Sequence, residues 1–557
     1  DQTRADFDFD RGSNAAATRI GSDGLIEKYR ANELLNSNQF DTTWTTSETL
    51  TSGQSGYDGL SDAWKLTAAN SFPNVNQSVS KSGVQTFSVY AKAGDVDHLR
   101  ILVVTGNNPD FRFDLSNGTI SSEAGSDKIK GKITSVGNGW YRCEVAFNGS
   151  GTSYRFYPMA DASTFAPIGD GLYIQSAQLE SGLCSTEYLN STSVTGKAGV
   201  LVDLPRINYD ANGENGALLL EPSRQQLIQF SEYFGDSSWT KTATTTEVGF
   251  LSPDGNLNAS KLLEDNTNSI HRIYQTATVS ASPNATISAY VKYNGRRFVL
   301  MRIADSSVGR WYDLIDGVKG DAFTSAPNDS TIEPVGNDWY RITISHSVAS
   351  VARFELWISD TESNSAYQGD TTKGVYLYGA QLEVNATYVS SYIPNHSGTG
   401  GVTRAADSCS VTGASDVIGQ SEGTAYIEVM YNNGGDAGVD SSFFAMKNSA
   451  GTTYFNIYRL NSTLAFRFFN AGANQFFHTE TPTNETLLKI AFSYKTNDFA
   501  LYINGVQEAT DTSGSVSGMS EVHLAGFNVG DNIADNYKTI LFNERLSNAE
   551  LATLTTL

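Results

Sequence analysis

Hydrophobic and polar residues alternate with a period of two in many short segments of the chain. Phe87, Val89 and Ala91, for example, would share one face of an extended segment, with more polar residues between them. Residues 340–345 alternate in the same way. Successive side chains of a strand point to opposite faces of its sheet, so this pattern predicts half-buried β-strands. Asn-Gly and Gly-Asn pairs, as at Asn117-Gly118, predict tight turns between these strands.

The alternating pattern is itself repeated along the chain. Three motifs recur at shifts of 200, 199 and 203 residues, namely 86–92 at 286–292, 136–142 at 335–341, and 177–180 at 380–383. A unit of domain size is therefore duplicated, as residues 33–190 and 225–396. Strands at short intervals in a unit of this size predict a two-sheet β-sandwich or jelly roll. Duplication is typical of a binding module used for avidity and is unusual for a catalytic domain.

Three segments lie outside the two repeats and before the last part of the chain. Residues 1–32 hold too few apolar residues for a core, which favours an N-terminal attachment segment. Residues 191–224 are interpreted as a connector between the repeats. Residues 397–415 begin with a run rich in Gly and Ser and have the composition of a flexible linker.

The last segment, residues 416–557, has a pattern of its own. Asn504-Gly505 lies between two alternating runs and predicts a hairpin. Near the C-terminus, Ser547 and Glu550 have the spacing of a capping box, which predicts a short terminal helix.

Composition supports an all-β protein of several domains. The chain has 557 residues, which corresponds to three or four domains at roughly 100–200 residues each. It contains 50 glycines, as expected for many turns between short strands. The net charge of −22 would repel a phosphate backbone, so nucleic-acid binding is disfavoured, and solubility explains the acidity. No segment approaches the roughly 18 apolar residues that span a bilayer, so membrane insertion is not expected.

The cysteines and histidines indicate neither a disulfide framework nor a zinc site. Cys143, Cys184 and Cys409 include no CxxC spacing, and the six histidines are scattered without ligand spacing. Cys143 lies in an apolar run and is expected to be buried. Residues 6–10 alternate Asp and Phe but lack the Gly and terminal Glu of an EF-hand loop. No cofactor is predicted, and a structural calcium ion elsewhere stays open.

Aromatic residues are the candidates for glycan contact, because an aromatic face suits the apolar face of a sugar ring. The Trp-Tyr-Arg motifs at 140–142 and 339–341 recur in both repeats and are interpreted as scaffold. Residues that differ between the repeats are better candidates for specificity. These are Arg310, Trp311, Tyr312 and Trp357 in the second repeat, and Phe111 and Arg112 in the first.

Two carboxylates recur at equivalent positions, Glu180 and Glu383. Glycoside hydrolysis needs a pair of carboxylates, but among 60 acidic residues the presence of pairs is uninformative. Their recurrence in both units favours a hydrogen bond to a neighbouring loop over catalysis. No nucleophile constellation or nucleotide-binding motif is visible, so no catalytic residue is predicted.

The last segment resembles the concanavalin A-like, or laminin-G-like, lectin fold. The matching residues are 489–494, 502–506, 522–526 and 539–551. The resemblance implies a two-sheet jelly roll of a kind that often binds glycans. The predicted fold class is therefore all-β, with tandem β-sandwich or jelly-roll domains of which the last is concanavalin A-like.

The repeats resemble carbohydrate-binding-type domains that are common in bacteriophage structural proteins. The matching residues are 379–383, 390–394, 402–407 and 218–228, with 11–13, 17–19 and 23–27 at the N-terminus. The first repeat departs from the pattern at residues 186–190, which replace the Ser-Tyr-Ile-Pro step. The resemblance implies a virion protein, either a tail fibre, a tail spike or a capsid appendage. It also implies other virion proteins as partners of the N-terminal segment and, by analogy, a homotrimer.

These observations lead to one functional hypothesis and several alternatives. The hypothesis is a non-enzymatic protein on the virion exterior that binds host-surface polysaccharide weakly at each module and gains strength by multivalency. The alternatives are a polysaccharide depolymerase or lyase of a tail spike, a purely structural head fibre, and an extracellular bacterial adhesin.

Overall fold

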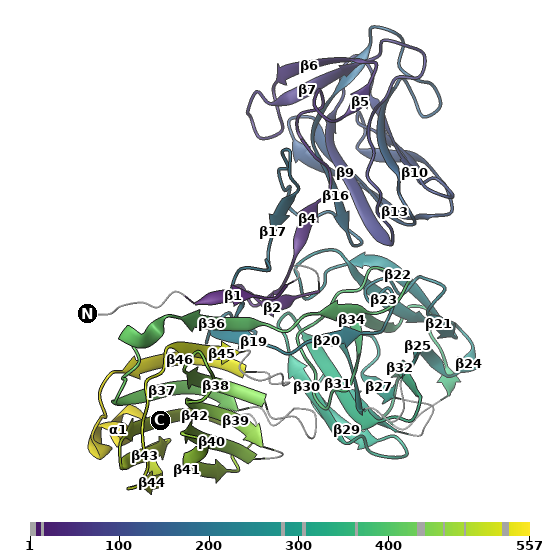
Figure 1. Ribbon diagram of the computed structural model, residues 1–557. Coiled ribbons are helices and arrows are strands. Elements are labelled where there is room, and N and C mark those ends of the chain that lie inside the picture. Colours follow the sequence, from purple (N-terminus) through teal and green to yellow (C-terminus); the bar gives the residue numbers. More distant parts are fainter. Residues whose placement is uncertain are drawn as a thin grey trace.

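The computed structural model contains three β modules, here called module 1 (residues 33–190), module 2 (residues 225–396) and module 3 (residues 416–557). It describes residues 7–12, 16–279, 284–303, 308–362, 366–431, 441–460, 463–483, 486–525 and 534–557. Asp6, Ser13 and Gly526, which belong to motifs of the sequence, lie outside these ranges. Module 1 stands above the other two modules, which lie side by side (Figure 1).

The predicted all-β fold class is confirmed. Apart from a 3-10 turn, η1 (Ala414–Asp416), and one short helix, α1 (Asn548–Leu554), the elements of the described residues are strands. Among the described residues, no helix is long and apolar enough to cross a membrane.

Module 1 is a sandwich of two six-stranded antiparallel sheets. The first has the order β13 (Lys128–Gly137), β14 (Trp140–Asn148), β9 (Val84–Lys92), β16 (Gly171–Ser181), β7 (Ala63–Thr67) and β6 (Thr49–Gln54). The second has the order β12 (Thr119–Ala124), β11 (Asp110–Asp114), β10 (His98–Val104), β15 (Ser153–Met159), β8 (Val75–Gln77) and β5 (Thr45–Thr46). Its core is built from the inward residues of both sheets, as in other sandwiches.

Module 2 repeats this strand order, which confirms that the sequence repeat is a structural one. Its first sheet runs β30 (Asp329–Pro334), β31 (Trp339–Ser347), β26 (Asn284–Asn294), β34 (Gly374–Val384), β23 (Ala259–Glu264) and β22 (Thr244–Phe250). Its second runs β29 (Val318–Ala322), β28 (Gly309–Asp313), β27 (Phe298–Ile303), β32 (Val351–Ser359), β25 (His271–Thr278) and β21 (Thr240–Thr242). A small ladder joins β24 (Asn268–Ser269) to β33 (Tyr367–Gln368).

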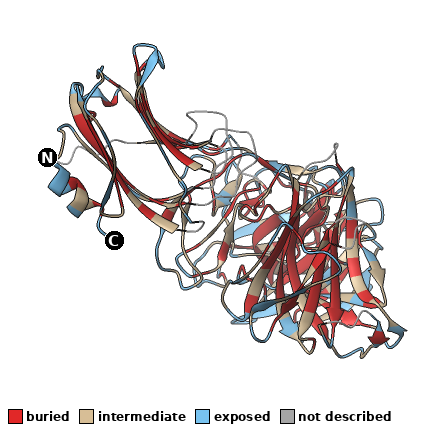
Figure 2. Ribbon diagram, turned by 90° about the horizontal axis from the view of Figure 1, so that it is seen from below, coloured by how far each residue is buried: buried red, intermediate tan, exposed pale blue. Residues whose placement is uncertain are grey.

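The central strands are buried more completely than their alternation predicts. Phe87, Val89 and Ala91 of β9 face the core, as expected, but Ser88 and Tyr90 on the opposite face are buried too. The reason is a loop of the same module, whose Tyr57 stacks on Tyr90 with ring centroids 3.9 Å apart. Buried strands of this kind run through the centre of the modules (Figure 2). The predicted burial of Cys143 is confirmed.

Module 3 is built on two seven-stranded sheets packed face to face, to which strands from outside residues 416–557 also belong. One has the order β1 (Asp8–Asp10), β36 (Ser408–Thr412), β45 (Glu521–Ala525), β38 (Ser441–Lys447), β39 (Tyr454–Leu460), β40 (Thr463–Asn470) and β41 (Ala473–Glu480). The other has the order β18 (Ile207–Asn208), β19 (Ala217–Leu220), β46 (Ala534–Phe542), β37 (Glu422–Tyr431), β42 (Thr486–Lys495), β43 (Asp498–Ile503) and β44 (Val506–Asp511). The hairpin at Asn504-Gly505 and the Ser547–Glu550 capping box are both present, as predicted.

The segments between the modules are structured, which corrects the description of residues 397–415 as a flexible linker. Those residues form β35 (Val402–Arg404), which pairs with β20 (Arg224–Gln226), and β36 of module 3. The connector 191–224 supplies β17 (Gly196–Ala198) and the strands β18 and β19 of module 3. Short extended segments are stable here because the edges of the modules satisfy their backbone hydrogen bonds.

The N-terminal segment is also integrated into the body of the protein. Its strand β1 pairs with β36, and Phe9 is part of the core of module 3. The hairpin of β2 (Thr18–Ile20) and β3 (Ile26–Lys28) lies on module 2, where Ile26 is buried. β4 (Arg30–Asn32) then pairs with β17 at the base of module 1. The segment lacks a core of its own, as predicted, and is buried against the cores of its neighbours instead.

A buried cluster of five charged side chains holds these segments together. It consists of Arg11, Arg206, Glu221, Arg404 and Asp407, whose side chains are at most 1% exposed. Arg206 Nη1 lies 2.6 Å from Glu221, and its Nη2 also bonds Asp407. Arg404 lies 3.1 Å from Glu221 and Arg11 lies 3.5 Å from Asp407. The N-terminal segment, the connector and residues 397–415 therefore meet at one point.

Removing one charge of this cluster is expected to destabilise the protein strongly. In an Asp407→Asn variant, Arg11 and Arg206 would lose their shared carboxylate in a water-free site, and a broken buried pair typically costs about 3–5 kcal/mol. Urea unfolding followed by tryptophan fluorescence measures the effect. The control is Asp370→Asn, whose partner Lys373 is 45% exposed, and which is expected to cost about 1 kcal/mol or less. Equal stability of the two variants would contradict this account.

The cluster also predicts a dependence of stability on acid. Burial alone would raise the pKa of Glu221, but Arg404 and Arg206 outweigh it and lower the pKa from 4.5 to about 2. Because the pKa of Glu221 is lower in the folded state, the stability that its ionised carboxylate contributes is complete above pH 4.5. This contribution is lost as the pH falls towards 2. The difference in unfolding free energy between the wild type and Glu221→Gln should therefore shrink across this window. A difference that stays constant would show that Glu221 does not titrate in this way.

Candidate functional site

The aromatic candidates of module 2 lie in buried positions. Trp311 and Trp357 are 3% and 5% exposed and form an apolar cluster with Leu300 on the outer face of the second sheet. Tyr312 is fully buried in the core, and its hydroxyl donates to the Thr343 carbonyl at 2.5 Å. The structure thus assigns these three rings to packing, which corrects the prediction of glycan contact.

A buried acid and three arginines complete that outer face of module 2. Glu355 is fully buried and accepts hydrogen bonds from Arg272 at 2.7 Å and Arg302 at 3.1 Å. The third arginine, Arg353, lies 3.7 Å from the same carboxylate. The Trp357 indole also donates to Glu355, at 2.6 Å. The guanidinium of Arg302 lies 5.0 Å from the centre of the Trp357 ring. The polar and aromatic side chains on this face therefore bind one another through hydrogen bonds and a cation–π contact.

The remaining candidates divide between core and surface. Phe111 is fully buried in the core of module 1, because its strand places it on the inward face. Arg112, the next residue, points outward and contacts Asp110 and Ser122. Arg310 of module 2 donates to the Gly320 carbonyl at 3.0 Å. Of the six candidates, only the two arginines keep partly exposed side chains.

The recurrent motifs form the scaffold that was predicted for them. Glu180 accepts from the Thr186 amide at 2.9 Å, and Glu383 accepts from the Ser390 amide at 3.0 Å. Each acid thereby holds the loop that leaves its module. Arg142 of the first Trp-Tyr-Arg motif donates to the carbonyl of the same Thr186. Burial raises the pKa of Glu180 despite its hydrogen bonds from Thr186 and Gln178.

Module 1 carries an exposed aromatic strip that sequence reasoning missed. It consists of Phe72, Phe165 and Tyr157, with ring centroids 5.5 Å apart for the first pair and 5.7 Å for the second. Phe72 is 69% exposed, Phe165 is half-buried and Tyr157 is 6% exposed. Arg100 lies over Tyr157 at 4.9 Å and is held by a bidentate pair with Asp110. The signal in the sequence was a single aromatic residue in an otherwise polar loop, residues 70–74.

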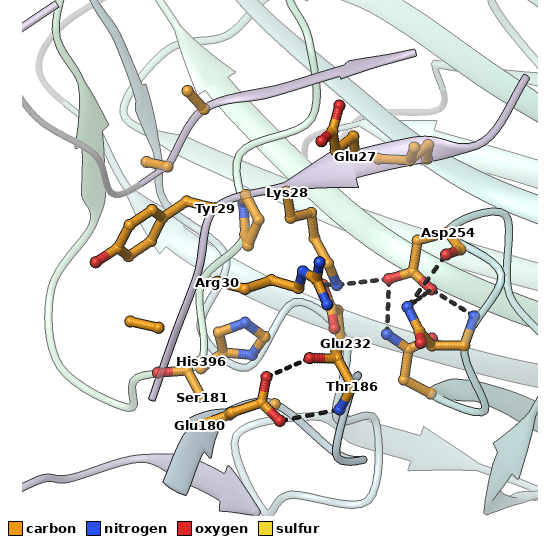
Figure 3. A pocket seen from close by; sticks show the side chains of 18 of the residues that line it. Glu27, Lys28, Tyr29, Arg30, Glu180, Ser181, Thr186, Glu232, Asp254 and His396 are labelled. Atoms are coloured by element: carbon orange, nitrogen blue, oxygen red, sulfur yellow. Dashed lines mark hydrogen bonds and ion pairs between the residues drawn. The ribbon is translucent and has the colours of Figure 1, made fainter. Parts of the chain in front are cut away.

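A large cavity lies where the N-terminal segment meets modules 1 and 2 (Figure 3). This junction pocket has a volume of about 880 Å³. It is lined by residues of all three parts, including Lys28, Arg30, Glu180, Glu232, Asp254 and His396. A second contact between the modules is apolar and consists of Val84, Leu183 and Phe230.

One buried network forms a wall of the junction pocket. Lys28, at the end of β3, places its ammonium 2.7 Å from Asp254, 3.0 Å from Glu232 and 2.9 Å from the Tyr378 hydroxyl. Burial alone would lower the pKa of Lys28, but Asp254 and Glu232 outweigh it and raise the pKa. Burial lowers the pKa of His396 below its usual 6.5, so its imidazole is neutral at pH 7.

Two side-chain groups among the described residues have the spacing of metal ligands. They are Asp97, His98 and Asp114 in module 1, and His478, Glu480 and Glu508 in module 3. The ligand atoms within each group lie within 4.8 Å of one another, and all six residues are half-buried. Imidazole nitrogen suits a transition metal better than calcium. The three cysteines are free thiols.

Comparison with known proteins returns only distant likenesses. No family model matches the chain, and neither does any curated protein. Among solved structures, the tandem CBM22 domain of Paenibacillus barcinonensis Xyn10C aligns at 13% identity, with a TM-score of 0.20, over 67% of this chain and 98% of its own. Domains LG4-5 of the mouse laminin α1 chain align at 7% identity, with a TM-score of 0.18, over 55% and 96%.

The LG1-3 region of the laminin α2 chain aligns at 9% identity, with a TM-score of 0.18, over 86% of this chain and 96% of its own. These neighbours are built from β-sandwich modules, but at such scores they establish no relationship. The class of the protein follows from its own topology, which is that of a chain of three β-sandwich modules, two of them equivalent.

Proposed function

We propose that the protein is a non-enzymatic adhesion protein on the exterior of a bacteriophage particle, where it binds host-surface polysaccharide. The observation that carries the binding role is the exposed aromatic strip of module 1. The phage setting is supported by the motifs at residues 218–228, 379–383 and 402–407. The first and last form the junction between modules 2 and 3, and residues 379–383 lie in strand β34 of module 2.

The strip has the chemistry that a sugar ring requires. The faces of Phe72 and Phe165 offer an apolar surface for stacking, and Phe72 has no protein neighbour over most of its surface. Arg100, Asp110 and Arg112 lie on the same sheet face and supply donors and acceptors for hydroxyl groups.

The two equivalent modules differ in the face that would bind. In module 2 the corresponding sheet face is occupied by buried rings and the Glu355 network, whereas in module 1 Phe72 is exposed and Phe165 is partly exposed. Module 1 is therefore the binding copy, and module 2 is a spacer. Several copies of the chain on one particle would convert weak binding at each module 1 into avidity.

Attachment to other virion proteins, or between the chains of a homotrimer, is assigned to the edge of module 3. Strand β1 is the last strand of its sheet, so its outer edge has no partner strand in the described part of the chain. A free edge of this kind can pair with a strand of another chain.

The binding role predicts a selective loss on substitution of Phe72. Phe72→Ala is expected to weaken binding of host polysaccharide about tenfold, which corresponds to about 1.4 kcal/mol and is typical of one lost stacking contact. Binding is measured by isothermal titration or on a glycan array. The matched control is Leu60→Ala, another residue with a largely exposed apolar side chain (62%), at the opposite end of β7. Equal affinities of both variants would refute the assignment.

The proposal that binding occurs without cleavage has a separate test. Incubation of host polysaccharide with the protein is expected to release no new reducing ends above a boiled-protein control. Steady production of reducing ends at constant protein concentration would instead identify a depolymerase.

A further inference from the structure

The junction pocket contains buried hydrogen-bond acceptors without donors. Glu232 and Asn258 line the pocket and are 1% and 4% exposed. In the described part of the chain, Glu232 Oε2 and Asn258 Oδ1 have no hydrogen-bond partner. Buried polar atoms are nearly always paired, so two unpaired acceptors in one cavity point to a bound group.

The donors nearest these two oxygens are already directed elsewhere. The three protons of the Lys28 ammonium are directed to Glu232 Oε1, Asp254 and the Tyr378 hydroxyl. Asn258 Nδ2 donates to Asp254 at 2.8 Å, and because a carboxylate only accepts, this contact fixes which end of the amide carries the free oxygen.

The pocket also presents unused donors. The guanidinium of Arg30 has no ion pair or hydrogen bond to any described residue, although the side chain is half-buried. Figure 3 shows Arg30 extending into the pocket beside Lys28. The neutral imidazole of His396 lies on the same wall and offers one donor and one acceptor.

We propose that the junction pocket binds a neutral saccharide of one or two rings. A hydroxyl group both donates and accepts, so one sugar can donate to Glu232 Oε2 and Asn258 Oδ1 and accept from Arg30. Its neutrality follows from the wall, where Lys28 is already paired with two carboxylates. The volume of about 880 Å³ falls within the roughly 300–1,000 Å³ of small-ligand sites.

The junction pocket is separate from the aromatic strip, and a ligand bound there would affect how module 1 is held. The choice of a sugar as the ligand rests on the proposed function, whereas the observation of two unpaired acceptors is independent of it. Because residues of the N-terminal segment, module 1 and module 2 all line the pocket, a bound sugar would fix module 1 on its neighbours.

The test uses the full chain with the Phe72→Ala substitution, so that the strip does not contribute. Glucose, galactose, N-acetylglucosamine, maltose and lactose are the probes, and saturation-transfer NMR is the measurement. At least one sugar is expected to bind, and Arg30→Ala should weaken that binding at least fivefold. Arg467→Ala, which removes a half-buried arginine of module 3, should leave it unchanged.

A second variant guards against a folding defect. Ser181→Trp places a bulky ring at the exposed rim of the pocket and should block the same sugar, with an unchanged circular dichroism spectrum. Absence of transfer from all five sugars, or binding that survives both variants, overturns the proposal. So does a crystal soaked with the sugars in which only water lies on Glu232 Oε2 and Asn258 Oδ1. If the aromatic strip proves not to bind polysaccharide, the outcomes expected for the junction pocket stay the same.

Discussion

The arrangement of the modules depends on a group of charges that water cannot reach. Three arginines and two carboxylates, contributed by segments up to 396 residues apart, form ion pairs at the meeting point of the inter-module segments. Each charge alone would be strongly disfavoured in such a place, so no member is tolerated without the others. This mutual requirement gives the inter-module segments a single arrangement, which their few apolar residues could not specify.

The two equivalent modules show how one scaffold is covered in two ways. Both carry a tyrosine and a tryptophan on the outer face of the first sheet, Tyr90 with Trp140 and Tyr290 with Trp339. In module 1 that surface is closed by Tyr57, from a loop of the module itself. In module 2 it is closed by the N-terminal hairpin through Ile26. The N-terminal segment therefore does for module 2 what an internal loop does for module 1.

Local patterns predicted the features that depend on local sequence. The duplication, the all-β class, the hairpin at Asn504 and the capping box at Ser547 all rest on residues close together in the chain. The loop-holding role of Glu180 and Glu383 followed from their recurrence alone. The charge cluster was out of reach, because Arg206 and Asp407 are 201 residues apart and carry no periodic signal. The burial of the four aromatic glycan candidates was missed for a related reason, since the alternation of residues along a strand does not show what packs on each face.

The paired strands β4 and β17 give module 1 a particular place in the chain. The polypeptide enters and leaves this module through neighbouring antiparallel strands, with Asn32 opposite Gly196. The module is thus an insertion whose two ends are already adjacent, and a short turn would close the gap if it were absent. The charge cluster, which fixes the other segments, contains no residue of this insertion.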